Sequence, residues 1–279
     1  DIPPGEDSIS PNRHPEIDSA DDLLDVISHV REISGLPVGF KAVIGAYGWL
    51  DELFTRIRER GIESAPDFIT VDGAEGGTGA APMPLIDDVG LPLGESLPLL
   101  VDKLAEYGLR DRVRVIASGK LVNPTQVAWA LCLGADFVVT ARGFMFALGC
   151  IQAMQCNRNT CPTGITTHNK RFQKGLNPVE KAERVANYVN NMAYEVGVIA
   201  HSCGVREPRE LRRHHARKSP ARQRHRTFQR AGRDQQSLRL QTVRTSVTRI
   251  AQLTIRRDVP HSRAGHVGHT FGPRGANQT

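Results

Sequence analysis

Three cysteines lie close together in the sequence and have the clearest chemical potential. They form the pattern Cys150-x5-Cys156-x4-Cys161, followed directly by Pro162. Zinc sites usually use four nitrogen or sulfur ligands, often in Cys-x2-Cys pairs, and the chain contains no such pair. An iron–sulfur cluster that needs only three protein ligands suits this spacing better. The alternative is that three unrelated cysteines lie near the end of a helix.

The other two cysteines are better explained by structure than by chemistry. Cys132 falls inside an amphipathic segment over 127–133, where it is expected to be a small core residue. Cys203 lies beside Gly204 near an expected helix end, with no partner visible in the sequence. An odd count of five cysteines, without a basic-then-apolar leader at the first residues, argues against a disulfide framework.

A glycine-rich segment is the second candidate site. It directly follows an apolar run over 68–71 and reads Gly73-Ala74-Glu75-Gly76-Gly77-Thr78-Gly79-Ala80-Ala81-Pro82. A turn needs only one or two glycines. Four of them favour a loop whose backbone comes close to a ligand and binds an anion or a flavin edge through N–H groups. A flexible turn is the other interpretation.

Two short segments after later apolar runs predict a phosphate site. They are Ser118-Gly119-Lys120 and Thr140-Ala141-Arg142-Gly143. The last βα turns of a (βα)8 barrel commonly bind phosphate together with helix N-termini. Arg142 would offer a bidentate fork to the phosphate. Lys120 would either add a point charge or remain a solvated loop residue.

Lys41 is unusual because it lies in the middle of an apolar run over 38–44. A lysine in a buried strand is costly unless it is paired or faces a pocket. The residue is therefore a candidate catalytic group. The alternative is contact with solvent from an edge strand.

Apolar runs that alternate with amphipathic segments would position these residues. Strands are expected over 38–44, 68–71, 113–117 and 137–140, and helices over 19–35, 48–60, 95–107, 124–133 and 178–200. This alternation predicts an α/β fold with a parallel sheet of four βα units. The four units are either half of a (βα)8 barrel or a small doubly wound sheet. No Gly-x-Gly-x-x-Gly follows the first strand, which disfavours a dinucleotide-binding fold.

The charge distribution separates the chain into a body and a tail. The formal net charge is +6, but residues 211–279 contribute +14 and residues 1–210 contribute −8. We expect 217–279 to be an Arg-rich tail that does not bury a core. It is interpreted as out-of-frame translation, a solvated extension, or an arm that binds nucleic acid without a recognisable module. No apolar run approaches the ~18 residues of a membrane span.

Taken together, the motifs resemble the FMN-binding synthase domain of glutamate synthases, and in particular the stand-alone glutamate synthase domain-containing proteins. The resemblance runs from about residue 5 to 215. The stretches that carry it are Ser8–Ile17, Pro37–Gly45, Glu75–Pro82, Gly134–Gly143 and Leu148–Gly164.

The resemblance implies a (βα)8 barrel that holds FMN beside a [3Fe–4S] cluster. By position, the cluster ligands would be Cys150, Cys156 and Cys161. The FMN phosphate would meet Ser118, Gly119 and the turn of Ala141, Arg142 and Gly143, and Lys120 is a further candidate cofactor-binding residue. Gly76, Gly77, Thr78 and Gly79 would border the flavin ring, with Lys41 near its polar edge or the substrate carboxylate.

In the complete enzymes of this family, the resemblance implies that glutamate forms from 2-oxoglutarate and ammonia in the cytoplasm. The electrons would come from a reduced pyridine nucleotide through a partner subunit, or from ferredoxin. A homo-oligomer is possible, and no specific nucleic acid is expected as a partner. The alternative is a non-catalytic electron-transfer or scaffold protein that retains the cluster.

The sequence departs from the family pattern in two segments. Ala74-Glu75 stands where glutamate synthases usually have His-Asp, and Ser118-Gly119-Lys120 stands where they usually have Asp-Gly-Gly. Both departures fit the stand-alone group. Because only four βα units are visible, residues 1–216 are expected to be a partial barrel from the second half of the domain. We expect such a chain not to be a competent enzyme alone.

Overall fold

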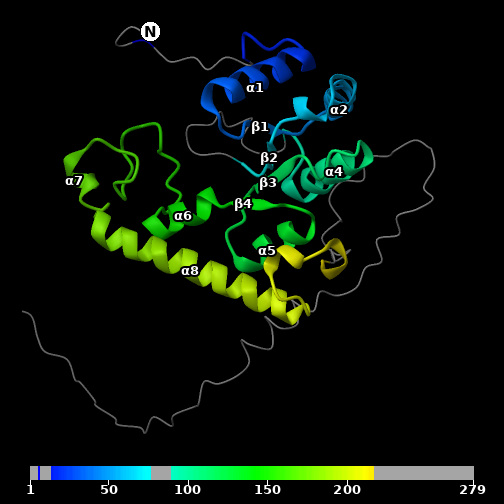
Figure 1. Ribbon diagram of the computed structural model, residues 1–279. Coiled ribbons are helices and arrows are strands. Elements are labelled where there is room, and N and C mark those ends of the chain that lie inside the picture. Colours follow the sequence, from blue (N-terminus) through cyan, green and yellow to red (C-terminus); the bar gives the residue numbers. More distant parts are fainter. Residues whose placement is uncertain (1–5, 7–13, 77–88, 217–279) are drawn as a thin grey trace, which may run out of the picture.

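The computed structural model describes residues 6, 14–76 and 89–216 (Figure 1). Gly77, Thr78 and Gly79 of the glycine-rich segment, and the whole Arg-rich tail, lie outside these residues. The helices are α1 (Ala20–Ser34), α2 (Gly48–Arg60), α4 (Leu93–Glu106), α5 (Pro124–Cys132), α6 (Ala141–Leu148), α7 (Lys170–Gln173) and α8 (Pro178–Ser202), with 3-10 turns η1 (Ile62–Ser64), η2 (Pro208–Glu210) and η3 (Arg213–His215). No helix in this part of the chain is long and apolar enough to cross a membrane.

The centre of the fold is a parallel sheet of four strands in the order β1-β2-β3-β4. The strands are β1 (Gly39–Val43), β2 (Phe68–Asp72), β3 (Arg114–Ser118) and β4 (Phe137–Val139). Their pairing places Val43, Asp72, Ser118 and Val139 at the same level, at the carboxyl edge of the sheet. The predicted α/β fold with four βα units is confirmed. These are units of the kind that build a (βα)8 barrel.

The first helix forms where its capping residues predict it. Ser19 and Asp22 make a reciprocal capping box at the start of α1, and Gly35 ends the helix with a φ of 65°. Helix α5 begins in the same manner, with Asn123 and Gln126 as the capping pair and Pro124 in the first turn. Helix α4 differs, because Pro92 precedes it and offers no side-chain cap.

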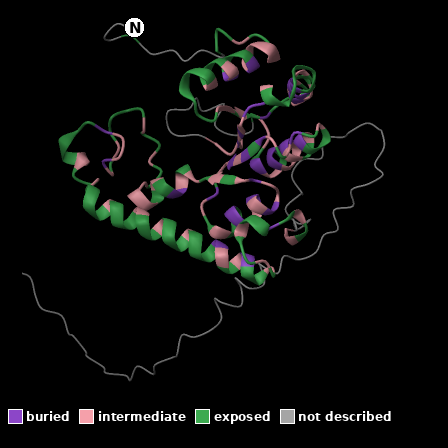
Figure 2. Ribbon diagram, viewed as in Figure 1, coloured by how far each residue is buried: buried purple, intermediate pink, exposed green. Residues whose placement is uncertain are grey.

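One face of the sheet is buried beneath helices, and the other is only partly covered (Figure 2). Val71 and Ala117 point to the helical side and are fully buried. They belong to a core in which Leu50, Leu53, Phe54 and Ile57 of α2 and Leu97, Leu100 and Leu104 of α4 are also buried. Side chains on the opposite face, such as Thr70 and Ile116, are half-buried. Polar groups on this face therefore remain accessible to a ligand.

The long helix α8 packs against α5 and α6 below the sheet (Figure 1). A second apolar cluster joins α5, the end of α8 and the segment that follows it, through Ala128, Cys132, Ala200 and Leu211. Cys132 is 7% exposed, which confirms its assignment to the core. Cys203 packs half-buried against the same cluster.

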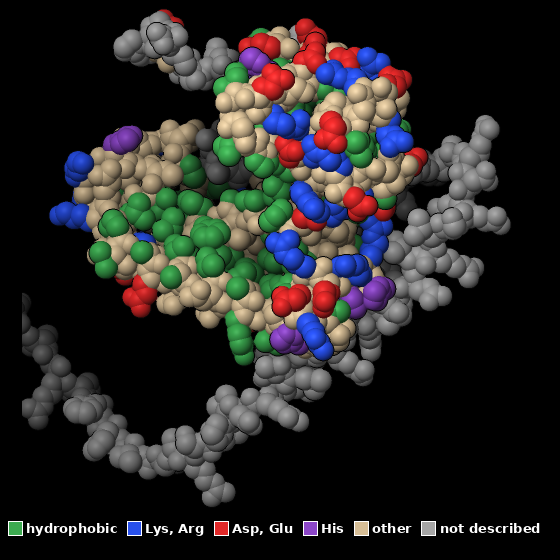
Figure 3. Space-filling model, viewed as in Figure 1, with side chains coloured by type: hydrophobic (Ala, Val, Ile, Leu, Met, Phe, Trp, Pro, Cys, Tyr) green, Lys and Arg blue, Asp and Glu red, His purple; other side chains and the backbone are tan. Residues whose placement is uncertain are grey.

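Large apolar side chains gather on the surface over α6 and α8 (Figure 3). Phe144 and Phe146 of α6 and Val139 of β4 are each more than a third exposed. Within the described residues, β4 is an outer strand of the sheet, like β1. The open side of the fold thus lies around β4 and α6, next to the carboxyl edge.

Candidate functional site

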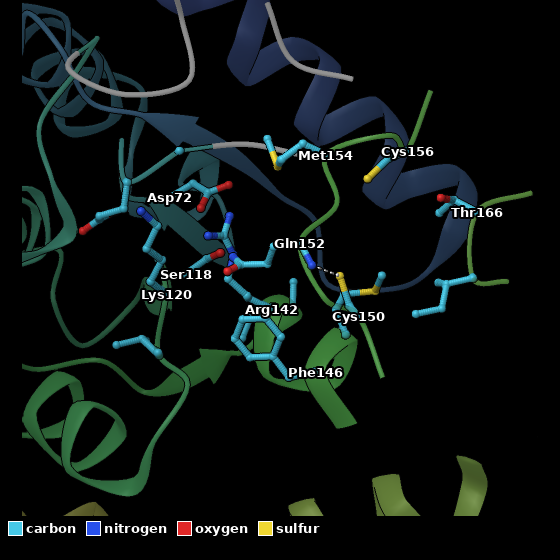
Figure 4. A pocket seen from close by; sticks show the side chains of 18 of the residues that line it. Asp72, Ser118, Lys120, Arg142, Phe146, Cys150, Gln152, Met154, Cys156 and Thr166 are labelled. Carbon is cyan, nitrogen blue, oxygen red and sulfur yellow. Dashed lines mark hydrogen bonds between the residues drawn. The ribbon is translucent and has the colours of Figure 1, made fainter. Parts of the chain in front are cut away.

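A cavity of about 470 Å³ opens at the carboxyl edge of the sheet (Figure 4). Cavities of this size are typical of small-molecule and cofactor sites. Ten residues predicted from the sequence line it: Lys41, Gly76, Ser118, Gly119, Lys120, Ala141, Arg142, Cys150, Cys156 and Cys161. Asp72, Ser118 and Lys120 lie on one side of the cavity, and Cys150, Cys156 and Thr166 lie on the other.

Lys41 is held at the cavity by an ion pair with Asp72. Its Nζ lies 3.0 Å from the Asp72 carboxylate, although the lysine side chain is 64% exposed. Lys41 is in register with Thr70, two residues before Asp72, so both charged side chains project from the same face of the sheet. Sequence reasoning missed Asp72. The sequence feature that could have indicated Asp72 is its position as the last residue of a strand, just before the glycine-rich segment.

Glu75 is the second carboxylate of the cavity, and it is partly buried. One oxygen accepts a hydrogen bond from the Leu93 amide at 2.5 Å, which supplies the N-terminal cap that Pro92 cannot give to α4. The other oxygen is buried without a hydrogen-bond partner in the described residues. Burial raises the pKa of Glu75, while the Leu93 amide and the charge of Lys120 act in the opposite direction.

The Glu75 carboxylate also explains two glycines. A Cβ on Gly73 would overlap the carboxylate, and a Cβ on Gly119 would come within 2.9 Å of it and 3.0 Å of Leu93. Gly119 is expected to meet the FMN phosphate, which would itself favour a residue without a side chain. The structure gives a reason within the protein itself: this carboxylate, packed where β2, β3 and α4 meet.

The segment after β4 forms the first turn of α6. Ala141 and Arg142 line the cavity from the amino end of this helix. Figure 4 shows the Arg142 side chain at the cavity. The N-terminus of a helix attracts anions through its N–H groups and dipole. Gly143 does not line the cavity. It is buried, and a Cβ there would overlap the hydroxyl of Tyr188 on α8.

The three clustered cysteines lie on the long loop that follows α6. The Cys150 sulfur accepts a hydrogen bond from the Gln152 amide at 3.4 Å. Burial opposes ionisation of Cys161, but hydrogen bonds from Thr163 and Thr166 outweigh it and lower the thiol pKa to about 6. Cys161 therefore ionises more readily than an ordinary cysteine thiol.

The loop places the three sulfurs on one cavity without gathering them into a ligand set. None of the five cysteines forms a disulfide. Within the described residues, no group of three or more Cys, His, Asp or Glu side chains is close enough to hold a metal ion. Two residues between the first two cysteines, Gln152 and Met154, have positive φ values of 55° and 53°. This backbone is unusual for residues other than glycine, so the loop conformation is locally strained.

Comparison with protein families identifies the family of this chain. The conserved region of glutamate synthase matches residues 1–206. The chain belongs to the glutamate synthase family. This family consists of oxidoreductases, and the match includes all the elements from β1 to α8 that surround the cavity.

Curated members of the family are similar over the same part of the chain. The glutamate synthase large subunit-like protein YerD of Bacillus subtilis is 44% identical over 214 residues, which is 77% of this chain and 40% of that protein. The archaeal glutamate synthase [NADPH] of Methanocaldococcus jannaschii is 32% identical over 222 residues, covering 76% and 41%. The chain thus spans about 40% of the length of these relatives.

Among solved structures, a mutant flavocytochrome b2 with benzoylformate matches with a TM-score of 0.41 and 16% identity. The match covers 90% of this chain and 46% of that one.

Proposed function

We propose that this chain forms part of the FMN and substrate site of a glutamate synthase-type oxidoreductase, which makes glutamate from 2-oxoglutarate and ammonia. The observation that carries the proposal is the convergence of predicted residues from five separate segments, from Lys41 to Cys161, on one cavity. Parallel α/β folds place their sites at this edge of the sheet. The match to the glutamate synthase family supports this choice of chemistry.

The residues around α6 fit the phosphate end of FMN. Ala141 and Arg142 bring the amino end of a helix and a guanidinium to the cavity wall, and Ser118, Gly119 and Lys120 face the same space. A phosphate needs these donors and positive charges. When bound, FMN would supply the hydride transfer, and the chain would orient the cofactor and exclude water.

The Lys41–Asp72 pair fits the substrate end of the cavity. The Lys41 ammonium attracts the carboxylates of an acid such as 2-oxoglutarate, and Asp72 holds the lysine in place from 3.0 Å. Glu75 places a second acidic group in the same cavity. These carboxylates would accept hydrogen bonds from the N–H groups of ammonia. The electron donor would be a reduced pyridine nucleotide bound by a partner subunit, or ferredoxin.

We extend the proposal to a [3Fe–4S] cluster held by Cys150, Cys156 and Cys161. All three line one cavity, and the lowered pKa of Cys161 gives it the thiolate character that a metal ligand needs. As placed, the sulfurs do not form a ligand group. Cluster binding therefore requires the loop between Cys150 and Cys161 to draw them together.

The experiment has two stages. The purified chain is first titrated with FMN. It is then co-expressed with the part of the Bacillus subtilis relative that it does not match, reduced anaerobically, and mixed with 2-oxoglutarate and isotope-labelled ammonium. We expect flavin binding in the first stage, and flavin reoxidation with labelled glutamate in the second.

Each cosubstrate alone is the matched control and should leave the flavin reduced. Lys41→Gln should slow reoxidation while flavin stays bound. Failure to bind FMN in either stage would overturn the proposal. Binding without reoxidation would instead support an electron-transfer or scaffold role.

A further inference from the structure

A tyrosine on α8 connects the two loops that carry the proposed phosphate donors. The Tyr188 hydroxyl donates a hydrogen bond to the Val122 carbonyl at 2.9 Å, in the loop after β3. It lies 3.1 Å from the Thr140 hydroxyl, in the position just before α6. A phenol has one hydrogen, and here it goes to Val122, so Thr140 must be the donor in the second bond.

This bond changes what Thr140 does at α6. Threonine is a preferred N-cap residue, because its side-chain oxygen accepts a hydrogen bond from an amide of the first turn. Thr140 occupies the N-cap position of α6 but makes no such bond. Its hydroxyl is directed to Tyr188 instead. Thr140 therefore gives no side-chain cap to the first turn of α6, at the point where Ala141 and Arg142 reach the cavity.

The residue at 143 is matched to this arrangement. The Tyr188 hydroxyl occupies the space that a Cβ of Gly143 would fill, and the Thr140 hydroxyl would lie only 2.5 Å from that Cβ. Only glycine lets the tyrosine approach the helix this closely. Gly143, Thr140 and Tyr188 thus form one unit that joins α8 to the amino end of α6.

We propose that Tyr188 is a positioning residue for the cofactor phosphate. By fixing the Thr140 side chain in the orientation that points its hydroxyl at Tyr188, it keeps the threonine oxygen from capping α6 and leaves the first-turn amides to a phosphate group. The inference rests on the proposed function, because it assumes that a phosphate-bearing flavin binds at this helix. It adds that Thr140 itself does not contact the phosphate.

The hydroxyl of Tyr188 can be tested separately from its ring. The ring packs edge-on against Phe144, with the centroids 5.7 Å apart. Tyr188→Phe keeps this contact and removes only the hydroxyl, which releases Thr140 to cap α6. A merely structural role of the ring predicts no change in how the protein distinguishes ligands.

The measurement is the binding of FMN and of riboflavin, which lacks the phosphate, to the full chain and its variants. The ratio of the two dissociation constants reports the contribution of the phosphate. We expect Tyr188→Phe to lower this preference for FMN roughly tenfold, the effect of a lost hydrogen-bonding contribution to a charged group. Riboflavin binding should stay unchanged.

A second substitution tests the route through Thr140. Thr140→Ala combined with Tyr188→Phe should recover the wild-type preference, because no hydroxyl remains to cap the helix. Thr140→Val alone should not lower the preference. Tyr194→Phe is the matched control on the same helix, since that side chain is 73% exposed.

The outcomes separate this inference from the proposed function. A wild-type chain that does not bind FMN would overturn the proposed function and this inference with it. Normal FMN binding with an unchanged preference in Tyr188→Phe would overturn the inference alone. A reduced preference in Thr140→Val would also overturn it, because the threonine would then be a phosphate ligand. That variant keeps the idea testable if Tyr188→Phe does not fold.

Discussion

Removal of the Glu75 side chain should destabilise the chain more than its place on a loop suggests. Glu75→Ala deletes the 2.5 Å hydrogen bond to Leu93, which is the side-chain cap of α4. It also empties the space between Gly73 and Gly119 that the carboxylate fills. Loss of an N-cap costs about 0.5–2 kcal/mol. The emptied space destabilises the chain further. Removal of the buried, unpartnered carboxylate oxygen has the opposite effect, because it relieves a desolvation cost.

The net expectation is a loss of about 1–2 kcal/mol in the free energy of unfolding. For a chain of this size, that corresponds to a decrease in Tm of roughly 2–8 °C. Thermal unfolding followed by circular dichroism measures it directly. The matched control is Glu95→Ala, because Glu95 lies in the first turn of the same helix but is exposed. Its Tm should change by less than about 2 °C.

The reasoning fails if Glu75→Ala and Glu95→Ala have the same small effect, because Glu75 would then not cap the helix. It also fails if Glu75→Ala raises the Tm. In that case the cost of burying the carboxylate would exceed the benefit of the hydrogen bond.

Three further predictions concern pH, the cluster and the phosphate site. Because burial raises the pKa of Glu75 above its ordinary 4.5, the folded protein holds this proton more tightly than the unfolded chain. This proton therefore contributes to the free energy of unfolding in full below pH 4.5, and the contribution is lost as pH rises through the raised pKa. The Tm of the wild type should fall over that pH window relative to the Tm of Glu75→Gln. A parallel decline in both proteins would assign the pH dependence elsewhere. Serine substitution of any proposed ligand should abolish the iron–sulfur EPR signal of reconstituted protein, while serine at either of the other two cysteines should not. Equal loss from all five substitutions would indicate general unfolding. The proposed ligands are Cys150, Cys156 and Cys161, and the controls are Cys132 and Cys203. Arg142→Ala should weaken FMN binding by about 1–3 kcal/mol in a fluorescence titration, and unchanged flavin retention after dialysis would count against this site.

Local signals in the sequence were sufficient for most of the fold. Ser19 and Gly35 predict both ends of α1, and the structure confirms them. The four strands follow from apolar runs, each within about two residues of its observed bounds. These features depend on neighbours in sequence, such as capping groups and apolar periodicity, and a single chain displays them directly.

The contacts that shape the cavity could not be predicted in the same way. Glu75 caps a helix that begins eighteen residues later, and Gly143 is small because of a tyrosine on α8. Both are long-range packing relations between segments that the sequence leaves unconnected. The segment 141–143 was expected as a turn after a strand, but it forms the first turn of α6. Its place beside α8 depends on tertiary structure.

The order of the strands has a consequence for how the molecule assembles during synthesis. Each strand pairs only with strands adjacent to it along the chain, so β1 and β2 can associate before β3 has left the ribosome. A shorter connection costs less entropy to close than a longer one, and chains generally fold from the amino end as they emerge. The cysteine loop and α8 emerge after all four strands. We therefore expect the strand ends that border the cavity to form before the loop that carries the thiols, so that cofactor loading is a late step.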